Sequence, residues 1–180
     1  NFTNNSGTVT LNSDSNEFAV IKVEGSASGN ITYYRYVNAV GNNEWDLIGS
    51  PVDGQSISGF ASTNTSGTAT LATNGSQYAI GVYDNSQDEW TNYTTGTVGA
   101  AGNFDIGKGY AMGTDSGATV AFTGTIATTD QTQAIIDNDA ANSGSGRRWD
   151  LIANPFPSFI NANDDAHASN NFLTVNTSKL

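Results

Sequence analysis

The sequence predicts an all-β protein: an antiparallel β-sandwich, jelly-roll-like or immunoglobulin-like, built from a duplicated unit and with almost no helix. Hydrophobic residues occur in short alternating runs, which clusters of Gly, Asn, Asp and Ser interrupt about every ten residues. The i, i+3, i+4, i+7 spacing of an amphipathic helix is nowhere sustained. An internal repeat, described below, indicates the duplication.

The alternating runs predict strands in chain order. Hydrophobic residues alternate with other residues in these runs, and clusters of Gly, Asn, Asp and Ser separate one run from the next. The only helical candidate is a turn or two within 161–171, where Ala and Asp are frequent. The predicted strands are 7–11, 17–24, 31–38, 45–49, 68–72, 78–83, 89–95, 104–113, 118–125, 131–136, 147–153 and 172–175.

Two segments of the chain occur twice, in the same order. Trp-Asp-Leu-Ile-Gly-Ser-Pro at 45–51 is repeated as Trp-Asp-Leu-Ile-Ala-Asn-Pro at 149–155, an offset of 104 residues. Phe-Ala-Ser-Thr-Asn-Thr-Ser at 60–66 is repeated as Phe-Leu-Thr-Val-Asn-Thr-Ser at 172–178, an offset of 112. These matches predict a duplicated unit with an insertion between them. The alternative is two similar strand-turn elements in an otherwise unrepeated sandwich.

The repeat divides the chain into three parts. Residues 1–28 are predicted to supply N-terminal strands that pack on the first unit, and residues 29–130 form that unit as a β-sandwich. Residues 131–180 are predicted to hold a linker strand and an incomplete second repeat, because nothing after 176 matches the later strands of the first copy. Unpaired strands at an open edge are either covered or used for pairing with another chain.

Charge and composition exclude several classes of protein. A net charge of -11 repels phosphate backbones and anionic membrane surfaces, so we expect neither nucleic-acid binding nor membrane insertion. Cysteine is absent and histidine occurs once, which excludes disulfides, thiol chemistry and zinc sites built on several Cys or His ligands. The polar, weakly charged composition favours an extracellular or cell-surface location.

Five motifs in order resemble a known module. They are Gly-Asn-Ile-Thr-Tyr-Tyr-Arg-Tyr at 29–36, the segment at 45–51, Gly-Lys-Gly-Tyr at 107–110, Phe-Thr-Gly at 122–124, and the segment from 149 extended through Phe-Pro-Ser at 156–158. The chain is similar to a β-rich repeat module of large secreted and surface proteins of Bacteroidota, many of them type IX secretion substrates. The resemblance implies a compartment and an architecture, and it says little about activity.

Carboxylates are abundant, but their positions argue against catalysis. Asp46 and Asp150 follow the repeated tryptophans, and their equivalence indicates a structural role such as capping a turn or pairing with an arginine. A serine hydrolase would have to use His167, and the chain has no Gly-x-Ser-x-Gly elbow. The glycines at 107 and 109 are expected to mark a bulge or a close backbone approach. We therefore expect no catalytic residues and no required cofactor.

Calcium is the one ion for which the sequence offers candidate ligands. Calcium needs six to eight oxygen ligands, and three turns are rich in carboxylate and amide oxygens. Asp and Asn are also the ordinary residues of solvated turns, so the sequence leaves both interpretations open. The candidate ligands are Asp84, Asp88, Asp137, Asp139, Asp164 and Asp165.

A glycan site would need aromatic rings beside polar groups. Trp90 and Tyr93 lie in one predicted strand, on opposite faces, and Tyr33 and Arg35 share a face of another. These four residues are the candidate glycan-binding residues. Trp45 and Trp149, at the heads of the duplicated strands, are predicted to be core anchors.

Together these observations predict a non-catalytic extracellular structural or adhesive module of a bacterial surface protein. Assembly into fibres through strand complementation extends this hypothesis, with other copies of the chain or neighbouring surface proteins as partners. A carbohydrate-binding module, with a polysaccharide partner, is the alternative. A carboxylate-based glycosidase or lyase is a third and weaker one.

Overall fold

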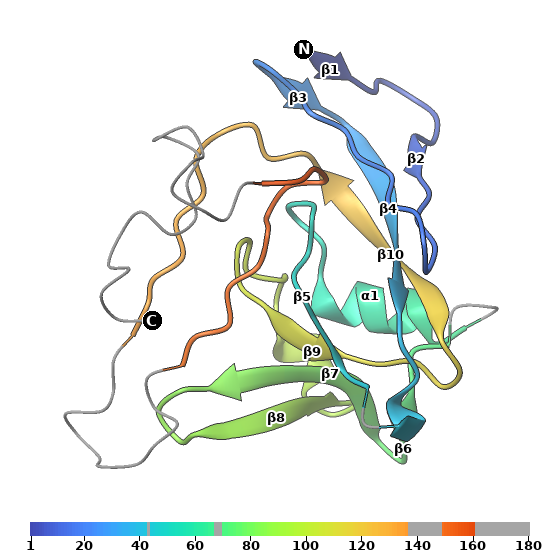
Figure 1. Ribbon diagram of the computed structural model, residues 1–180, viewed down its shortest axis with the longest axis vertical. Coiled ribbons are helices and arrows are strands. Elements are labelled where there is room, and N and C mark those ends of the chain that lie inside the picture. The colour runs from blue at the N-terminus through green and yellow to red at the C-terminus, as the bar shows by residue number, and fades with distance from the viewer. Residues whose placement is uncertain (43, 67–69, 137–148, 161–180) are drawn as a thin grey trace.

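The computed structural model describes residues 1–42, 44–66, 70–136 and 149–160, and Figure 1 shows their arrangement. These residues form several β-sheets with one short α-helix, so the predicted all-β class is confirmed. No helix among the described residues is long and apolar enough to cross a membrane.

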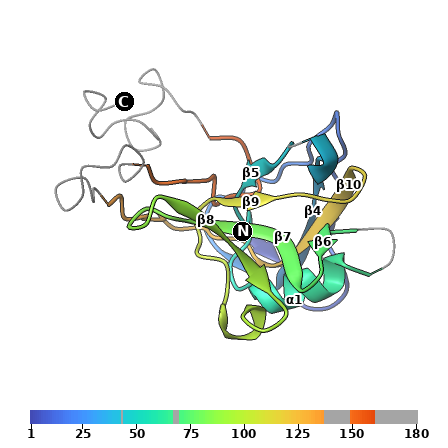
Figure 2. The ribbon, with the colours of Figure 1, turned by 90° about the horizontal axis from the view of Figure 1, so that it is seen from below.

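Two larger sheets and one small ribbon make up the fold (Figures 1 and 2). The first sheet has the order β10 (Ala118–Thr125), β4 (Asn30–Val37) and β2 (Thr10–Leu11). The second has the order β5 (Asp46–Ile48), β9 (Tyr110–Met112), β7 (Gln77–Asp84) and β6 (Thr73–Asn74), with β8 (Glu89–Thr94) also paired to β7. β1 (Phe2–Thr3) and β3 (Ala27–Ser28) form the ribbon.

The N-terminal strands run parallel to their partners, which differs from the purely antiparallel sandwich expected. β1 pairs parallel with β3, and β2 pairs parallel with β4, whereas β4 and β10 form an antiparallel ladder over eight residue pairs. Parallel pairing needs a long crossover rather than a tight turn. Residues 12–29 provide that connection between β2 and β4.

One hydrophobic core joins both sheets and the helix. Phe60, Phe104 and Phe122 stack with ring centroids 4.5 to 5.8 Å apart, and Tyr110 packs against Phe104 at 4.9 Å. The N-terminal 28 residues contribute partly buried side chains around this cluster, including Phe2, Leu11 and Val23. A single core without disulfides therefore carries the stability of the fold.

The α-helix lies where the sequence predicted none. α1 (Ile57–Asn64) overlaps the first copy of the 60–66 repeat and packs against β10. The Ser56 hydroxyl caps its start by accepting a hydrogen bond from Gly59 N at 3.2 Å. Ile57, Phe60, Ala61 and Asn64 are buried, so the helix has an apolar stripe that is only two turns long.

Side-chain and loop groups cover the outer edge of β10. Asn64 Oδ1 accepts from Ala121 N at 2.8 Å, and Asn64 Nδ2 donates to Ala121 O at 3.1 Å. Gln55 Oε1 accepts from Thr123 N at 2.7 Å, and Asp53 exchanges two backbone hydrogen bonds with Thr125. The amide of Asn64 thus takes the place of a neighbouring strand, so this edge presents no unpaired donor at 121, 123 or 125.

The long strands match their predicted ranges closely, and most of the shorter predicted strands do not. β4, β7, β8 and β10 each lie within about one residue of the prediction. Segments 17–24 and 131–136 form no strand, and the prediction for 104–113 shortens to β9. Only isolated bridges form at Leu71 and Ile152. The predictions for 161–171 and 172–175 lie outside the described residues.

Candidate functional site

The two copies of the repeated segment lie side by side in space. β5, from the first copy, pairs antiparallel with β9 over residues 110–112. The second copy pairs antiparallel with the three residues just before β9, because Gly109 N donates to Leu151 O and Ala153 N donates to Gly107 O, both at 2.8 Å. Figure 1 shows this second segment passing the upper end of β5. One stretch of chain, 107–112, therefore organises both copies.

Equivalent residues of the two copies make equivalent hydrogen bonds. The Asp46 carboxylate accepts from Asn38 N at 2.6 Å, and the Asp150 carboxylate accepts from Ile136 N at 2.9 Å. Ser50 Oγ accepts from the backbone N of Val52, two residues on, at 3.4 Å, and at the matching position Asn154 Oδ1 accepts from Phe156 N at 3.0 Å. The structural role predicted for both aspartates is confirmed, since each holds a neighbouring segment.

Small residues allow the copies to approach. A Cβ atom added at Gly109 would collide with the side chain of Leu151, and one added at Gly49 would lie 2.5 Å from the Cβ of Ala153. Gly107 has φ of 83°, in the left-handed region that favours glycine. The close backbone approach predicted for the Gly-Lys-Gly motif is thus confirmed at Gly109. Gly49 and Ala153 occupy the same position of the repeat, so the copies meet at equivalent residues.

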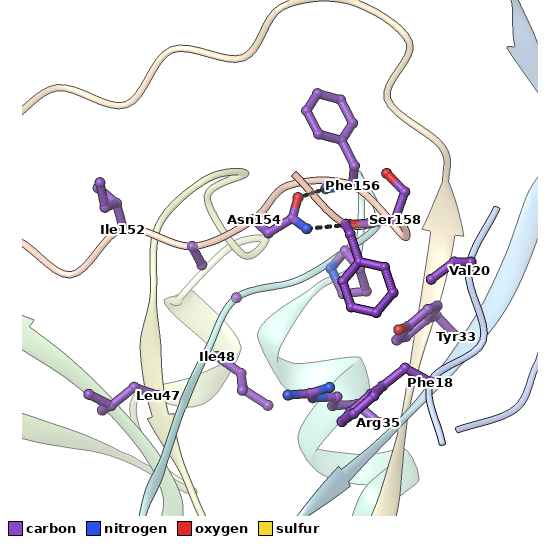
Figure 3. A pocket seen from close by; sticks show the side chains of 14 residues that line it. Phe18, Val20, Tyr33, Arg35, Leu47, Ile48, Ile152, Asn154, Phe156 and Ser158 are labelled. Atoms are coloured by element: carbon purple, nitrogen blue, oxygen red, sulfur yellow. Dashed lines mark hydrogen bonds between the residues drawn. The ribbon is translucent and has the colours of Figure 1, made fainter. Parts of the chain in front are cut away.

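A groove opens where the copies meet the N-terminal segment and β4 (Figure 3). Its cavity volume is about 370 Å³, in the range of pockets that take a small ligand. We call it the Arg35 groove. It is lined by Phe18 and Val20, by Tyr33 and Arg35 of β4, by Leu47, Ile48, Gly49 and Pro51 of the first copy, by Ile152, Ala153 and Asn154 of the second, and by Phe156, Ser158 and Phe159.

Arg35 carries the one positive charge among the groove's lining residues. Its guanidinium carbon lies 4.4 Å from the centroid of the Phe18 ring, a cation–π contact, and Figure 3 shows Arg35 and Ile48 pointing toward one another. The ion pairs among the described residues join Lys22 to Glu24 and Lys108 to Asp105, and neither involves Arg35. Within this part of the chain, the guanidinium therefore has an aromatic contact but no carboxylate.

The other polar side chains that line the groove belong to Tyr33, Asn154 and Ser158. The amide of Asn154 is used internally, because it donates to Ser158 O and accepts from Phe156 N. Tyr33 is 7% exposed, and its hydroxyl makes no hydrogen bond with the described residues. Since no buried side-chain oxygen among those residues is unpaired, that hydroxyl reaches solvent through the groove.

The rim of the groove is apolar and exposed. Phe18, Val20, Leu47 and Phe159 are 42% to 77% exposed, although a folded chain ordinarily buries such residues. Three of them come from different parts of the chain: the N-terminal segment, the first copy and the segment after the second copy. Exposed apolar residues that line one groove mark an interaction site more often than a scattered set of hydrophobic residues does.

The prediction that Trp45 and Trp149 anchor the core is wrong. Trp45 is 37% exposed and Trp149 is 67% exposed. The alternation of the strand explains the first case: Asp46 and Ile48 face inward, where Asp46 binds Asn38, so Trp45 and Leu47 face outward. Motif position alone did not reveal which face of the strand is buried.

The four predicted glycan-binding residues do not form one site. Tyr33 and Arg35 line the groove from β4, while Trp90 and Tyr93 lie on β8 in the other sheet. Trp90 is 46% exposed and contacts Tyr83 at 5.3 Å between ring centroids. Tyr93 packs partly buried against the core. The apolar groove residues Phe18, Leu47 and Phe156 were missed, because nothing in the local sequence indicates that these segments meet.

Two of the six predicted calcium ligands lie among the described residues. Asp84 accepts from the hydroxyl and backbone N of Ser86, and Asp88 accepts from the Tyr83 hydroxyl at 2.7 Å. No group of three His, Cys, Asp or Glu residues that could hold a metal ion occurs in the described ranges. Asp137, Asp139, Asp164 and Asp165 lie outside those ranges, as does His167.

A second cavity, also of about 370 Å³, lies between the end of β7 and the second copy. Asp84, Lys108 and Asp150 line it. A glycosidase needs a carboxylic acid with a raised pKa, but hydrogen bonds lower the pKa of Asp84. The other described carboxyl groups with a displaced pKa, Asp14 and Glu24, are also shifted downward. The shift at Asp84 is therefore opposite to the one that the acid of a glycosidase needs.

The chain belongs to a family described as a domain of unknown function (DUF8693), whose profile matches residues 2–179. The match spans nearly the whole chain, including both copies of the repeat. Comparison with curated proteins and with solved structures gave no match. The resemblance to secreted Bacteroidota modules stays a prediction from the sequence motifs.

Proposed function

We propose that this chain is a non-catalytic recognition module with an adhesive or structural role at the surface of a bacterial cell, and that the Arg35 groove is its contact site. The observation that carries the proposal is the convergence of both repeat copies on a solvent-open groove that has exposed apolar side chains and a guanidinium without a carboxylate partner among the described residues. Burying exposed rim residues against a partner would be favourable, at roughly 25 cal/mol per Å² of apolar area.

The proposed module needs no cofactor and performs no reaction. In support, no carboxylate or imidazole, which are the commonest general acids and bases, lines the groove. The extracellular location rests on the sequence motifs and on the polar, acidic composition.

The proposal is tested with beads that carry the purified chain, washed over panels of immobilised proteins and polysaccharides. The variant Leu47→Gln makes the rim polar at a residue that is 58% exposed, so it is expected to fold normally and to lower bead retention several-fold. Ile135→Gln is the matched control, because Ile135 is 62% exposed and lies outside both cavities. Equal retention of both variants would remove the groove from the proposal.

A carbohydrate-binding module is the second candidate, and the exposure of Trp90 beside Tyr83 favours it. Ring faces of this kind stack on sugars. On the polysaccharide panel, Trp90→Ala is expected to abolish retention without lowering the melting temperature if this candidate is right. Retention that depends on Leu47 and not on Trp90 would leave the groove as the contact site.

The structural role that we propose for the module is assembly into fibres through strand pairing, and this assembly requires an open sheet edge. The edge of β10 is closed by Asn64, Gln55 and Asp53. Among the described strands, β8 pairs only with β7 and β5 only with β9, and β8 is the longer of these two edge strands, so β8 offers an edge for pairing with another copy. Electron microscopy and sedimentation of the purified chain test this. If the chain stays monomeric at high concentration, the assembly hypothesis is wrong, and the recognition role of the groove is unaffected.

A further inference from the structure

We propose that the Arg35 groove recognises a carboxylate joined to an apolar group, as presented by an acidic residue beside an apolar residue in a segment of a partner protein. The inference rests on the proposed function and names the chemistry that its contact site would take.

Charge complementarity supplies the first step. The chain has 17 acidic and 6 basic residues, so a basic side chain can readily find an acidic partner. Lys22 and Lys108 do so, at 2.9 and 3.8 Å. Arg35, half-buried against Phe18, does not do so within the described residues. A guanidinium presents N–H donors in a fixed fork that fits a carboxylate.

The two polar groups of β4 supply the second step. Tyr33 and Arg35 are two residues apart on one strand, so their side chains leave the same face about 7 Å apart. The Tyr33 hydroxyl can donate to a carboxylate oxygen that Arg35 also binds. Together they form a short polar wall beside the apolar side chains of Ile48 and Pro51, and a few polar groups among apolar side chains are the usual arrangement of a site that orients a small anionic group.

The apolar side chains of the groove determine which group, attached to the carboxylate, binds best. Val20, Ile48, Pro51 and Ile152 offer no polar side-chain atoms, and the Asn154 amide is already used. A sugar acid carries several hydroxyls, and each hydroxyl buried without a partner weakens binding. An apolar peptide side chain buries against this wall without such a loss. The lining therefore favours an acidic-apolar peptide over an acidic sugar.

The test uses 3-phenylpropionate as the minimal probe and 3-phenylpropanamide as its uncharged analogue of the same shape. Binding to the 180-residue chain is followed by nuclear magnetic resonance shifts of the groove residues. We expect the carboxylate to bind at least ~10-fold more tightly than the amide, and added salt to weaken its binding. Equal affinity for both probes, or no binding at tens of millimolar, would overturn the proposal.

Three variants separate the contact from general electrostatics. Arg35→Gln is expected to lower carboxylate affinity by ~10-fold or more, and Arg35→Lys to recover part of it. Lys22→Gln changes the net charge by the same amount outside the groove and should leave affinity unchanged. Circular dichroism confirms that each variant folds. If Lys22→Gln weakens binding as much as Arg35→Gln does, the attraction is not local and the proposal is wrong.

The source of the carboxylate is tested with acetyl-Leu-Asp-Phe-amide against trigalacturonate. Tighter binding of the peptide, lost in Arg35→Gln, supports a protein partner. Tighter binding of the sugar would overturn that choice in favour of an acidic polysaccharide. If no carboxylate binds while bead retention still depends on Leu47, the proposed function stands and only this ligand class fails.

Discussion

Replacing Asn64 tests whether one amide holds the edge of the first sheet. In Asn64→Leu the side chain keeps its approximate volume but loses its hydrogen bonds to Ala121 N, Ala121 O and Phe60 O. The site is buried, since Asn64 is 0% exposed, so the two backbone groups of Ala121 lose their partner where water has little access. At about 1 to 3 kcal/mol for each such group, and some gain from the apolar side chain, we expect a loss of about 2 to 4 kcal/mol.

Urea unfolding measures this loss directly. With an m-value of about 2 kcal/mol per molar, the midpoint is expected to fall by roughly 1 to 2 M. Ser62→Ala on the same helix is the control, because Ser62 is exposed and its change should stay within about 0.5 kcal/mol. An Asn64→Leu variant as stable as Ser62→Ala would refute the reasoning that the amide substitutes for a strand.

Three further predictions concern the repeat and the tyrosines. Gly109→Ala forces a Cβ into Leu151 and should lower the free energy of unfolding by about 2 kcal/mol, whereas Gly99→Ala, which meets no neighbouring atom, should be neutral in the same thermal melt. Asp46→Ala removes two hydrogen bonds with Asn38 and should cost about 2 kcal/mol, against no more than about 1 for Asp150→Ala, which loses one hydrogen bond to the described residues; equal losses in urea would contradict this. Burial, followed by the hydrogen bond and charge of Asp88, raises the pKa of Tyr83 from 10.0 to about 12. The folded state therefore keeps a proton that the unfolded state releases, and the free energy of unfolding should fall as pH rises from 10 toward 12. The ultraviolet titration of the wild type minus that of Tyr83→Phe should have its midpoint near 12, and a midpoint near 10 would contradict the assignment.

Local pattern was enough to predict the long strands. β4 and β10 alternate because one face packs on the core, and Gly29 and Gly117 directly precede the two runs. It failed at α1, although Ile57, Phe60, Ala61 and Asn64 have helical spacing after a Ser56 cap. The buried stripe of α1 covers only two turns, and one of its four residues is Asn64, whose hydrogen-bond partner Ala121 lies 57 residues away. A polar residue in so short a stripe hides the helical spacing until the contact with β10 is known.

The site was predicted in part, for a similar reason. Placing Tyr33 and Arg35 on one face followed from the period of two along a strand, and both residues line the groove. Phe18 and the repeat residues enter the same site only through tertiary contacts, such as the hydrogen bond from Ile21 N to Pro157 O at 2.7 Å. Segment 17–24 alternates as a strand would, yet it forms no ladder and is hydrogen-bonded at Ile21 to the loop that contains Pro157. In this arrangement the ring of Phe18 covers the guanidinium of Arg35.

The walls of the groove come from segments 104 residues apart along the chain, and this separation bears on the order of folding. Contacts of such high sequence separation carry a large loop-closure entropy, so they form late, after the β7–β8 hairpin has paired. The second copy pairs with 107–109 through an isolated bridge at Lys108 and Ile152, whereas β4 and β10 pair over eight residues, so we expect the second copy to open first while β4 and β10 stay paired. Amide hydrogen exchange at Gly109 and Ala153 should then be faster than at Val120 and Phe122, and a partner that fills the groove should slow it.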